Sequence, residues 1–280
     1  MKLANVNGRA ALIVGGSAID VAGASSGSFG PELSAIYESW DAFAAWASSA
    51  AVAGGLAGGL AFSDADLGAP SPSPTQVFAI GLNYRAHAAE GGREVPKAPA
   101  VFTKFPTCLG RPFDPVASVP GRHDWEAELV VVIGRRAHNV SAADAWSYVA
   151  GVTCGQDYSE RDTQNASGGH FSLGKSFPGF GPTGPWLVTP DELANCDDLA
   201  ISCEVSGTMM QSSRTSNMVF AVPTLVEHIS SVVTLLPGDL IFTGTPEGVG
   251  FARNPPRLLA VGDTVVTTIE GIGVIRQSIV

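Results

Sequence analysis

Residues 125–133 read Trp-Glu-Ala-Glu-Leu-Val-Val-Val-Ile, which places two glutamates at the head of an unbroken apolar run. Such a run predicts a strand that is buried on both faces. Because side chains two apart on a strand point the same way, Glu126 and Glu128 are expected to face one spot. Two adjacent carboxylates raise each other's pKa unless a cation lies between them. The segment alone leaves two interpretations open: half of a metal site, or a strand end that reaches solvent.

Short apolar runs separated by Gly/Pro turns dominate the chain after residue 75. Helical patterns are fewer and cover residues 142–148 and 224–233. Strands do not alternate regularly with helices, so a doubly wound sheet is disfavoured and a curved, mostly antiparallel β architecture is expected. The predicted strands are residues 77–80, 129–133, 200–205, 240–242, 264–269 and 274–280.

The first 68 residues are predicted to form a small domain of their own. Strands are expected at residues 10–14 and around residues 20–21, followed by an Ala-rich helix over residues 36–53 that Gly54-Gly55 would end. Residues 68–74 contain three prolines alternating with serines, which neither a helix nor a central strand tolerates. We therefore place the domain boundary there, between residues 1–68 and 75–280.

The composition limits the classes of molecule that the chain is expected to bind. Its 280 residues are 45% hydrophobic and carry a formal net charge of −10, with only 16 Lys and Arg, so no basic stripe exists for nucleic acid. An anionic small molecule would need a local cationic cluster or a metal. Residues 42–62 are uncharged, but they are mostly Ala, Gly and Ser, so a soluble helix is favoured over a membrane span.

Cysteine usage and the N-terminus both favour a cytoplasmic protein. The four cysteines lack Cys-x-x-Cys spacing and are expected to be reduced, mostly buried thiols. The first residues lack the apolar core of a secretion signal. The cysteines are Cys108, Cys154, Cys196 and Cys203.

A third acid is needed before two glutamates make a site for a hard cation, because Mg²⁺ and Mn²⁺ prefer oxygen ligands. Asp157 is the strongest candidate, since it follows an apolar strand and precedes a polar cluster. A helix cap or surface loop explains Asp157 equally well from this segment alone.

Residues 83–90 directly follow the strand at 77–80 and are typical of a helix start. His87 and Glu90 lie three apart, so on a helix they meet on one face. A carboxylate fixes the imidazole tautomer and raises its basicity, which suits a general base. An ordinary surface His-Glu pair is the alternative.

Two further features could bind an anion. The glycines of residues 244–250 allow a tight loop that presents backbone N–H groups and the Thr245 hydroxyl, although the Lys-Ser/Thr pair of a Walker loop is absent. Lys175 lies between Gly and Ser in a stretch poor in charge. The sequence alone does not decide whether Lys175 is exposed or catalytic.

Taken in chain order, seven motifs closely resemble the fumarylacetoacetate hydrolase family from about residue 75 to the C-terminus. Two departures are Gln156, where the family often has Asn, and Ser206-Gly207, where it often has Asn-Gly. The motifs are Gly81-Leu82-Asn83-Tyr84-x-x-His87-x-x-Glu90, Glu126-x-Glu128-Leu129, Asp157-x-Ser159-x-Arg161-Asp162-x-Gln164, Gly174-Lys175-Ser176, Gly184-Pro185-Trp186, Pro237-Gly238-Asp239-Leu240 and Thr243-Gly244-Thr245-Pro246-x-Gly248-Val249-Gly250.

The resemblance implies an α+β, mainly β fold. A mixed β-roll or β-sandwich catalytic domain over residues 75–280 would follow a small N-terminal α+β domain, and the protein would be a homodimer. One divalent cation is implied, with Mg²⁺ expected and Mn²⁺ or Ca²⁺ as alternatives. Its ligands by motif match are Glu126, Glu128 and Asp157. The matched catalytic residues are His87, Glu90 and Lys175. The matched substrate-binding residues are Arg161, Gln164 and Thr245.

The implied activity is metal-dependent hydrolysis of a C–C bond in a small anionic 2,4-dioxo acid, of the acylpyruvate, fumarylpyruvate or fumarylacetoacetate type. His87, oriented by Glu90, would deprotonate the attacking water, and an enolate would form. The same site could instead support an oxaloacetate-type decarboxylase, or a dehydratase or isomerase of a 2-oxo acid. A non-catalytic binding protein is a further alternative, but the metal ligands, the His-Glu pair and the lysine occur together, which disfavours it.

Overall fold

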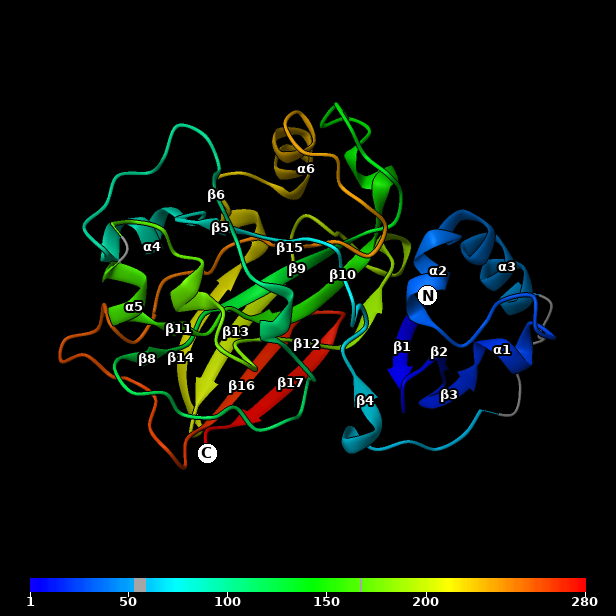
Figure 1. Ribbon diagram of the computed structural model, residues 1–280, viewed down its shortest axis with the longest axis horizontal. Helices are drawn as coiled ribbons and strands as arrows, with labels where there is room; N and C mark the ends of the chain where they lie inside the picture. Colours follow the sequence, from blue (N-terminus) through cyan, green and yellow to red (C-terminus); the bar gives the residue numbers. More distant parts are fainter. Residues whose placement is uncertain (53–58, 167) are drawn as a thin grey trace.

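A large mixed sheet forms the centre of the computed structural model, which describes residues 1–52, 59–166 and 168–280 (Figure 1). Nine strands follow the order β3-β2-β1-β12-β10-β9-β15-β5-β6, while β4 pairs with β1 and β7 with β12. Their bounds are β1 Lys2–Val6, β2 Arg9–Val14, β3 Ser17–Asp20, β4 Leu67–Gly68, β5 Val77–Gly81, β6 Ala100–Thr103, β7 Leu109–Gly110, β9 Ala127–Ile133, β10 Val149–Gln156, β12 Gly181–Val188 and β15 Leu240–Phe242.

A second sheet has the order β14-β13-β16-β17, and two short strands, β8 and β11, pair separately. Their bounds are β8 His123–Asp124, β11 Ser159–Glu160, β13 Ala200–Val205, β14 Thr208–Arg214, β16 Thr264–Ile269 and β17 Gly273–Ser278. The β13–β14 hairpin turns through Ser206 and Gly207, both with positive φ, which matches the right-handed twist of the strands. The expected mainly β, mostly antiparallel fold is confirmed, with β5 parallel to β15 and β7 parallel to β12.

Helices are short and lie outside the sheets. The α-helices are α1 Val21–Ala24, α2 Leu33–Glu38, α3 Trp40–Val52, α4 Arg85–Glu90, α5 Arg161–Ala166 and α6 Val222–Ser230. Single 3₁₀ turns cover Asp64–Asp66, Pro106–Cys108, Ala145–Tyr148, Leu173–Lys175, Pro190–Glu192 and Thr215–Asn217.

Strand β9 carries the apolar run and is buried along its whole length. Leu129, Val131 and Ile133 belong to the core shared with the second sheet. Val130 and Val132 belong to the core on the opposite face, which includes side chains of α2 and α3. Because each face of β9 is covered, the strand has no polar-out alternation, and each buried side chain contributes about 1.5–3 kcal/mol.

The N-terminal segment joins the large sheet, since β1 pairs antiparallel with β12. The predicted strand at 10–14 is confirmed as β2, and its partner is β3. The single helix expected over residues 36–53 is wrong in the described part: α2 ends at Glu38 and α3 begins at Trp40. The Ser39 hydroxyl donates to the Ala35 carbonyl at 2.6 Å, and this side-chain bond competes with helix continuation.

The expected helix end at Gly54-Gly55 lies outside the described residues. Within the described parts of the chain, no helix has the length and apolarity that crossing a bilayer requires. The division into domains at residues 68–75 stays a prediction.

Several elements differ from the sequence-based expectation. The helix expected over 142–148 is only the 3₁₀ turn Ala145–Tyr148, whereas the one expected over 224–233 is α6, shifted by about one turn. The apolar strand expected before Asp157 is β10, whereas β12 was not predicted. Two glycines interrupt β10, and two prolines interrupt β12, which normally argues against a central strand.

Candidate metal centre and active site

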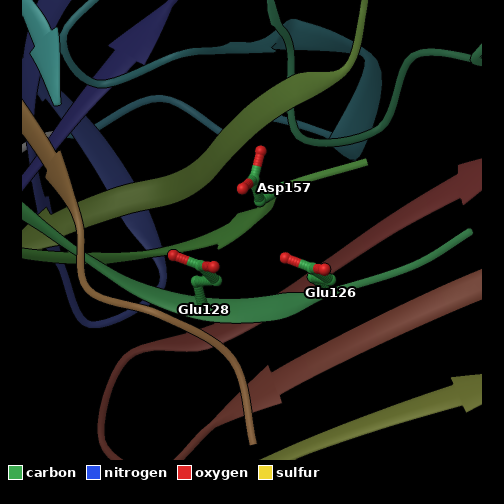
Figure 2. Close-up of side chains that lie close together, drawn as sticks. All are labelled: Glu126, Glu128 and Asp157. Atoms are coloured by element: carbon green, nitrogen blue, oxygen red, sulfur yellow. The ribbon is translucent and has the colours of Figure 1, made fainter. Parts of the chain in front are cut away.

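Three carboxylates meet where β9 begins and β10 ends (Figure 2). Glu126 immediately precedes β9, Glu128 lies within it, and Asp157 follows the last residue of β10. Each offers an oxygen within 4.8 Å of the others, and all three side chains are buried. The strand register explains the meeting, because Glu128 pairs with Gly155 and the Asp157 N–H donates to the Glu126 carbonyl at 2.9 Å.

Buried amides fix the backbone that carries these acids. The Gln156 side-chain oxygen accepts from the Glu126 N–H at 2.9 Å, and its amide donates to Thr267 of the second sheet at 2.8 Å. The Gln211 side-chain oxygen accepts from the Ala127 N–H at 3.0 Å. Two residues far apart in the chain therefore hold the start of β9 in place.

Three cationic side chains surround two of the carboxylates. The Lys175 ammonium lies 2.6 Å from Glu126 Oε2 and 2.7 Å from Asp157 Oδ2. Lys104 donates to Asp157 Oδ1 at 2.6 Å, and Arg161 Nη2 lies 2.7 Å from Glu126 Oε1. Both oxygens of Glu126 and both oxygens of Asp157 therefore already have a positive partner.

Glu128 is different, because in the described part of the chain it forms no ion pair. Its Oε2 accepts from the Gly244 N–H at 2.8 Å, and Gly244 adopts a φ of 100° to make this contact. Burial, together with Asp157 and Glu126, raises the pKa of Glu128 well above its ordinary value. Burial alone would raise the pKa of Glu126 as well. The nearby Lys175, Arg161 and His87 have a larger, opposite effect, so the pKa of Glu126 is lowered to about 2.

This arrangement fits a hard divalent cation. Three buried oxygen donors lie close together, and one of them lacks a counter-charge among the described residues. A buried carboxylate without a counter-charge is costly, and a cation with oxygen-rich coordination removes that cost. Glu126, Glu128 and Asp157 would hold such an ion.

The predicted His-Glu pair forms on α4. His87 Nδ1 lies 2.7 Å from Glu90 Oε1, and the other Glu90 oxygen accepts from the Gly248 N–H at 2.8 Å. Because a carboxylate only accepts, Nδ1 carries a proton, and in the neutral imidazole Nε2 is then the nitrogen with the lone pair. Glu90 therefore orients the imidazole and also ties α4 to the loop after β15.

One pocket brings most of the predicted site residues together. His87, Glu126, Arg161, Gln164, Lys175 and Thr245 all line it. Glu90 contacts His87 and Asp157 contacts Lys175, both at 2.7 Å, and Glu128 has an oxygen within 4.8 Å of an oxygen of Glu126. Gln164 accepts from Arg161 Nη1 at 3.0 Å, and the Thr245 hydroxyl donates to the Ala127 carbonyl at 2.8 Å. Aromatic rings complete the wall: Phe102, Phe171 and Phe251.

The loop at 244–250 differs from the expected anion-binding loop. Its Gly244, Gly248 and Gly250 amides donate to Glu128, Glu90 and Asp124 respectively. These three N–H groups thus position carboxylates of the protein itself.

Sequence reasoning missed Lys104 and Asp124. Asp124 accepts from Arg161 at 2.8 Å and from two amides of the loop after β15. Lys104 is 1% exposed, follows β6 directly and contacts Asp157. The only signal for either was a charged residue beside an apolar strand, which is too common to single out a site.

Lys104→Met should destabilise the metal-free protein, because it leaves Asp157 buried with one cationic partner fewer. Removing one member of a buried ion pair costs about 3–5 kcal/mol. Urea unfolding in EDTA measures the effect, and the exposed Lys97→Met should change stability by less than about 0.5 kcal/mol. Equal unfolding midpoints for the two variants would contradict this role for Lys104.

His123 makes the fold sensitive to acid. It is 1% exposed, stacks on Phe180 at 4.7 Å, and neither ring nitrogen has a hydrogen-bond partner among the described residues. Burial lowers its pKa from 6.5 to about 4, so between these pH values the unfolded chain binds a proton that the folded chain does not. Stability is therefore lost as the pH falls from 6.5 to 4, by up to about 3 kcal/mol.

His123→Phe removes the titrating group and keeps an aromatic ring on Phe180. The free energy of unfolding of the variant should fall less than that of the wild type over this pH range. Urea titrations at pH 7, 5.5 and 4 measure the difference. If the free energies of unfolding of the variant and the wild type fell in parallel with pH, His123 would not be the source of the acid sensitivity.

The chain is similar in sequence and in fold to known proteins. The family "Fumarylacetoacetate (FAA) hydrolase C-terminal" matches residues 76–280. Oxaloacetate tautomerase Fahd2a, mitochondrial, of Rattus norvegicus is 44% identical over 214 residues, which are 76% of this chain and 68% of the relative.

Solved structures also match the whole chain. The crystal structure of a candidate HpcE protein from Mycobacterium smegmatis is 48% identical with a TM-score of 0.94, covering 100% of this chain and 99% of that one. Maleylpyruvate hydrolase from Sphingobium sp. SYK-6, solved with manganese(II) and pyruvate, is 27% identical with a TM-score of 0.80 and the same coverage. The match to residues 76–280, a range that contains all the residues lining the pocket, shows that this chain belongs to the fumarylacetoacetate hydrolase family.

Proposed function

We propose that this chain is a divalent-metal-dependent enzyme that interconverts the keto and enol forms of a short 2-oxo acid of the oxaloacetate type. The observation that carries the proposal is the His87–Glu90 pair, whose imidazole lines the same pocket as Glu126 and Lys175. A base with a free nitrogen beside the ammonium group of Lys175 suits removal of a proton next to a carbonyl group. The 44% identical tautomerase relative supports this choice of reaction.

The residues divide the proposed reaction between them. His87 Nε2 accepts the proton from C3, and the electron pair of the C3–H bond moves toward C2 and its oxygen to give an enolate. The imidazolium then returns the proton to that oxygen, which completes the enol. Glu90 holds the imidazole in the required tautomer, and Lys175 stabilises the negative charge that develops. A divalent cation, when bound, would add Lewis-acid polarisation of the 2-oxo group.

Hydrolysis of a C–C bond is the second candidate, and the full-length likeness to maleylpyruvate hydrolase favours it. His87 would then deprotonate a water that attacks the C4 carbonyl of a 2,4-dioxo acid. The C3–C4 bond breaks, its electron pair stays on C3, and a proton completes pyruvate. Both reactions need the same base and the same stabilised enolate, so the geometry of these residues serves either.

A substrate panel separates the candidates. Oxaloacetate and a series of acylpyruvates, each with Mg²⁺ or with EDTA, are followed by proton NMR. A tautomerase speeds the enol-to-keto conversion of oxaloacetate without forming pyruvate, a decarboxylase forms pyruvate and CO₂, and a hydrolase forms pyruvate and a second acid. We expect the first pattern with Mg²⁺ only. An unchanged tautomerisation rate would reject the tautomerase assignment.

A further inference from the structure

Arg93 is a cationic side chain of the pocket whose charge the protein does not use. Among the described lining residues, the permanent positive charges belong to Arg93, Arg161 and Lys175. Arg161 is paired with Asp124 and Glu126, and Lys175 with Glu126 and Asp157. The Arg93 side chain has no ion pair or hydrogen bond within the described chain, and it is exposed.

The backbone of Arg93 is fixed to the helix that carries His87. The Arg93 N–H donates to the Ala88 carbonyl at 2.9 Å, and the Gly92 N–H donates to the Ala89 carbonyl at 3.0 Å. Gly92 has a φ of 63°, so α4 ends in the Schellman arrangement. Arg93 therefore follows α4 at a defined place, three residues beyond Glu90, and lines the pocket from there.

The buried charges of the site, a bound divalent cation and one substrate carboxylate would balance without Arg93. Four buried carboxylates, Asp124, Glu126, Glu128 and Asp157, face three buried cations, Lys104, Arg161 and Lys175. A divalent cation would leave one surplus positive charge, which one substrate carboxylate neutralises. A second carboxylate would have no counter-charge at the metal end, and the aromatic residues of the wall offer none.

We propose that Arg93 binds the carboxylate at the far end of the substrate, so that the pocket selects short 2-oxo dicarboxylates over 2-oxo monocarboxylates. A guanidinium group suits this task because its planar fork pairs with both oxygens of a carboxylate. This inference rests on the proposed function for the substrate's 2-oxo end. It adds Arg93 as the residue that binds the carboxylate at the other end of the substrate.

The test compares two stable ligands on the Mg²⁺-loaded protein by calorimetry. Malate has four carbons and a carboxylate at each end, whereas 2-hydroxybutyrate carries a methyl group in place of the far carboxylate. Arg93→Gln should weaken malate binding about tenfold or more and leave 2-hydroxybutyrate and Mg²⁺ binding unchanged. Arg93→Lys should restore part of the malate affinity, since the charge returns without the fork.

Arg85→Gln is the matched control. Arg85 is exposed at the start of α4, the helix that Arg93 follows, and it lies outside this pocket. It should bind both ligands as the wild type does. Equal malate affinity for Arg93→Gln and wild type, a loss shared by both ligands, the same loss in Arg85→Gln, or no malate binding by wild type would each overturn the inference.

The oxaloacetate assay separates this inference from the proposed function. An inactive wild type whose malate binding depends on Arg93 would reject the reaction and keep the role of Arg93. If the wild type is active and Arg93→Gln leaves its KM for oxaloacetate unchanged, the proposed reaction is kept and the role of Arg93 is rejected.

Discussion

His87→Ala should lower turnover of the substrate about 10²- to 10⁴-fold, because it removes the proposed base that takes the C3 proton. The imidazole is held by Glu90 and lines the pocket, yet it is not among the three carboxylates that would hold the cation. Divalent-cation affinity should therefore stay within about threefold of the wild type. The assay is the NMR rate of oxaloacetate tautomerisation, paired with calorimetric titration of Mn²⁺.

His138→Ala is the control for this variant, since His138 is exposed and lies outside the pocket, and among the described residues its ring forms a hydrogen bond with the neighbouring Asn139 alone. Its turnover should equal that of the wild type. If His87→Ala kept wild-type turnover, His87 would not be the base. If it also lost the cation, the lower activity would have a different cause.

Glu128→Gln should abolish tight cation binding and, with it, activity. The variant removes one of three buried carboxylate ligands and leaves the shape of the side chain intact. In EDTA its thermal stability should equal or exceed that of the wild type, because the buried Glu128 lacks an ion-pair partner in the described structure and has two other carboxylates nearby. In contrast, removing one member of a buried ion pair usually lowers stability.

Thermal unfolding with and without Mg²⁺ measures both effects. The wild type should gain about 3 kcal/mol at a cation concentration of about 100 times Kd, and Glu128→Gln should gain nothing. Glu38→Gln, an exposed glutamate on α2, should follow the wild type. A Glu128→Gln protein that was stabilised by Mg²⁺ as strongly as the wild type would remove Glu128 from the ligand set.

Periodic and local patterns made much of the fold predictable. The apolar run of β9 and the strands β13, β15 and β16 follow directly from residue type, because burial on a sheet selects β-branched residues. The His87–Glu90 contact also follows from helical spacing alone. Strand β12 could not be predicted, because its two prolines are tolerated only through pairings with β10, β7 and β1 that lie far away in sequence.

The candidate site depended on contacts that sequence spacing does not encode. Glu126 and Asp157 come together through the register of β9 and β10, which the resemblance implied but local patterns did not. Lys104 reaches Asp157 from β6, at the far edge of the sheet order, and no local signal marked it. Long-range pairing is therefore the part of this site that required the structure.

We propose that Glu126, Glu128 and Asp157 hold one divalent cation beside His87. Crystals soaked in Mn²⁺, with diffraction recorded at the manganese absorption edge, test it most directly. We expect a single strong anomalous peak roughly 2.1 Å from one oxygen of each of the three carboxylates. A peak elsewhere, or none at this position after soaking, would show that these three carboxylates do not hold the cation.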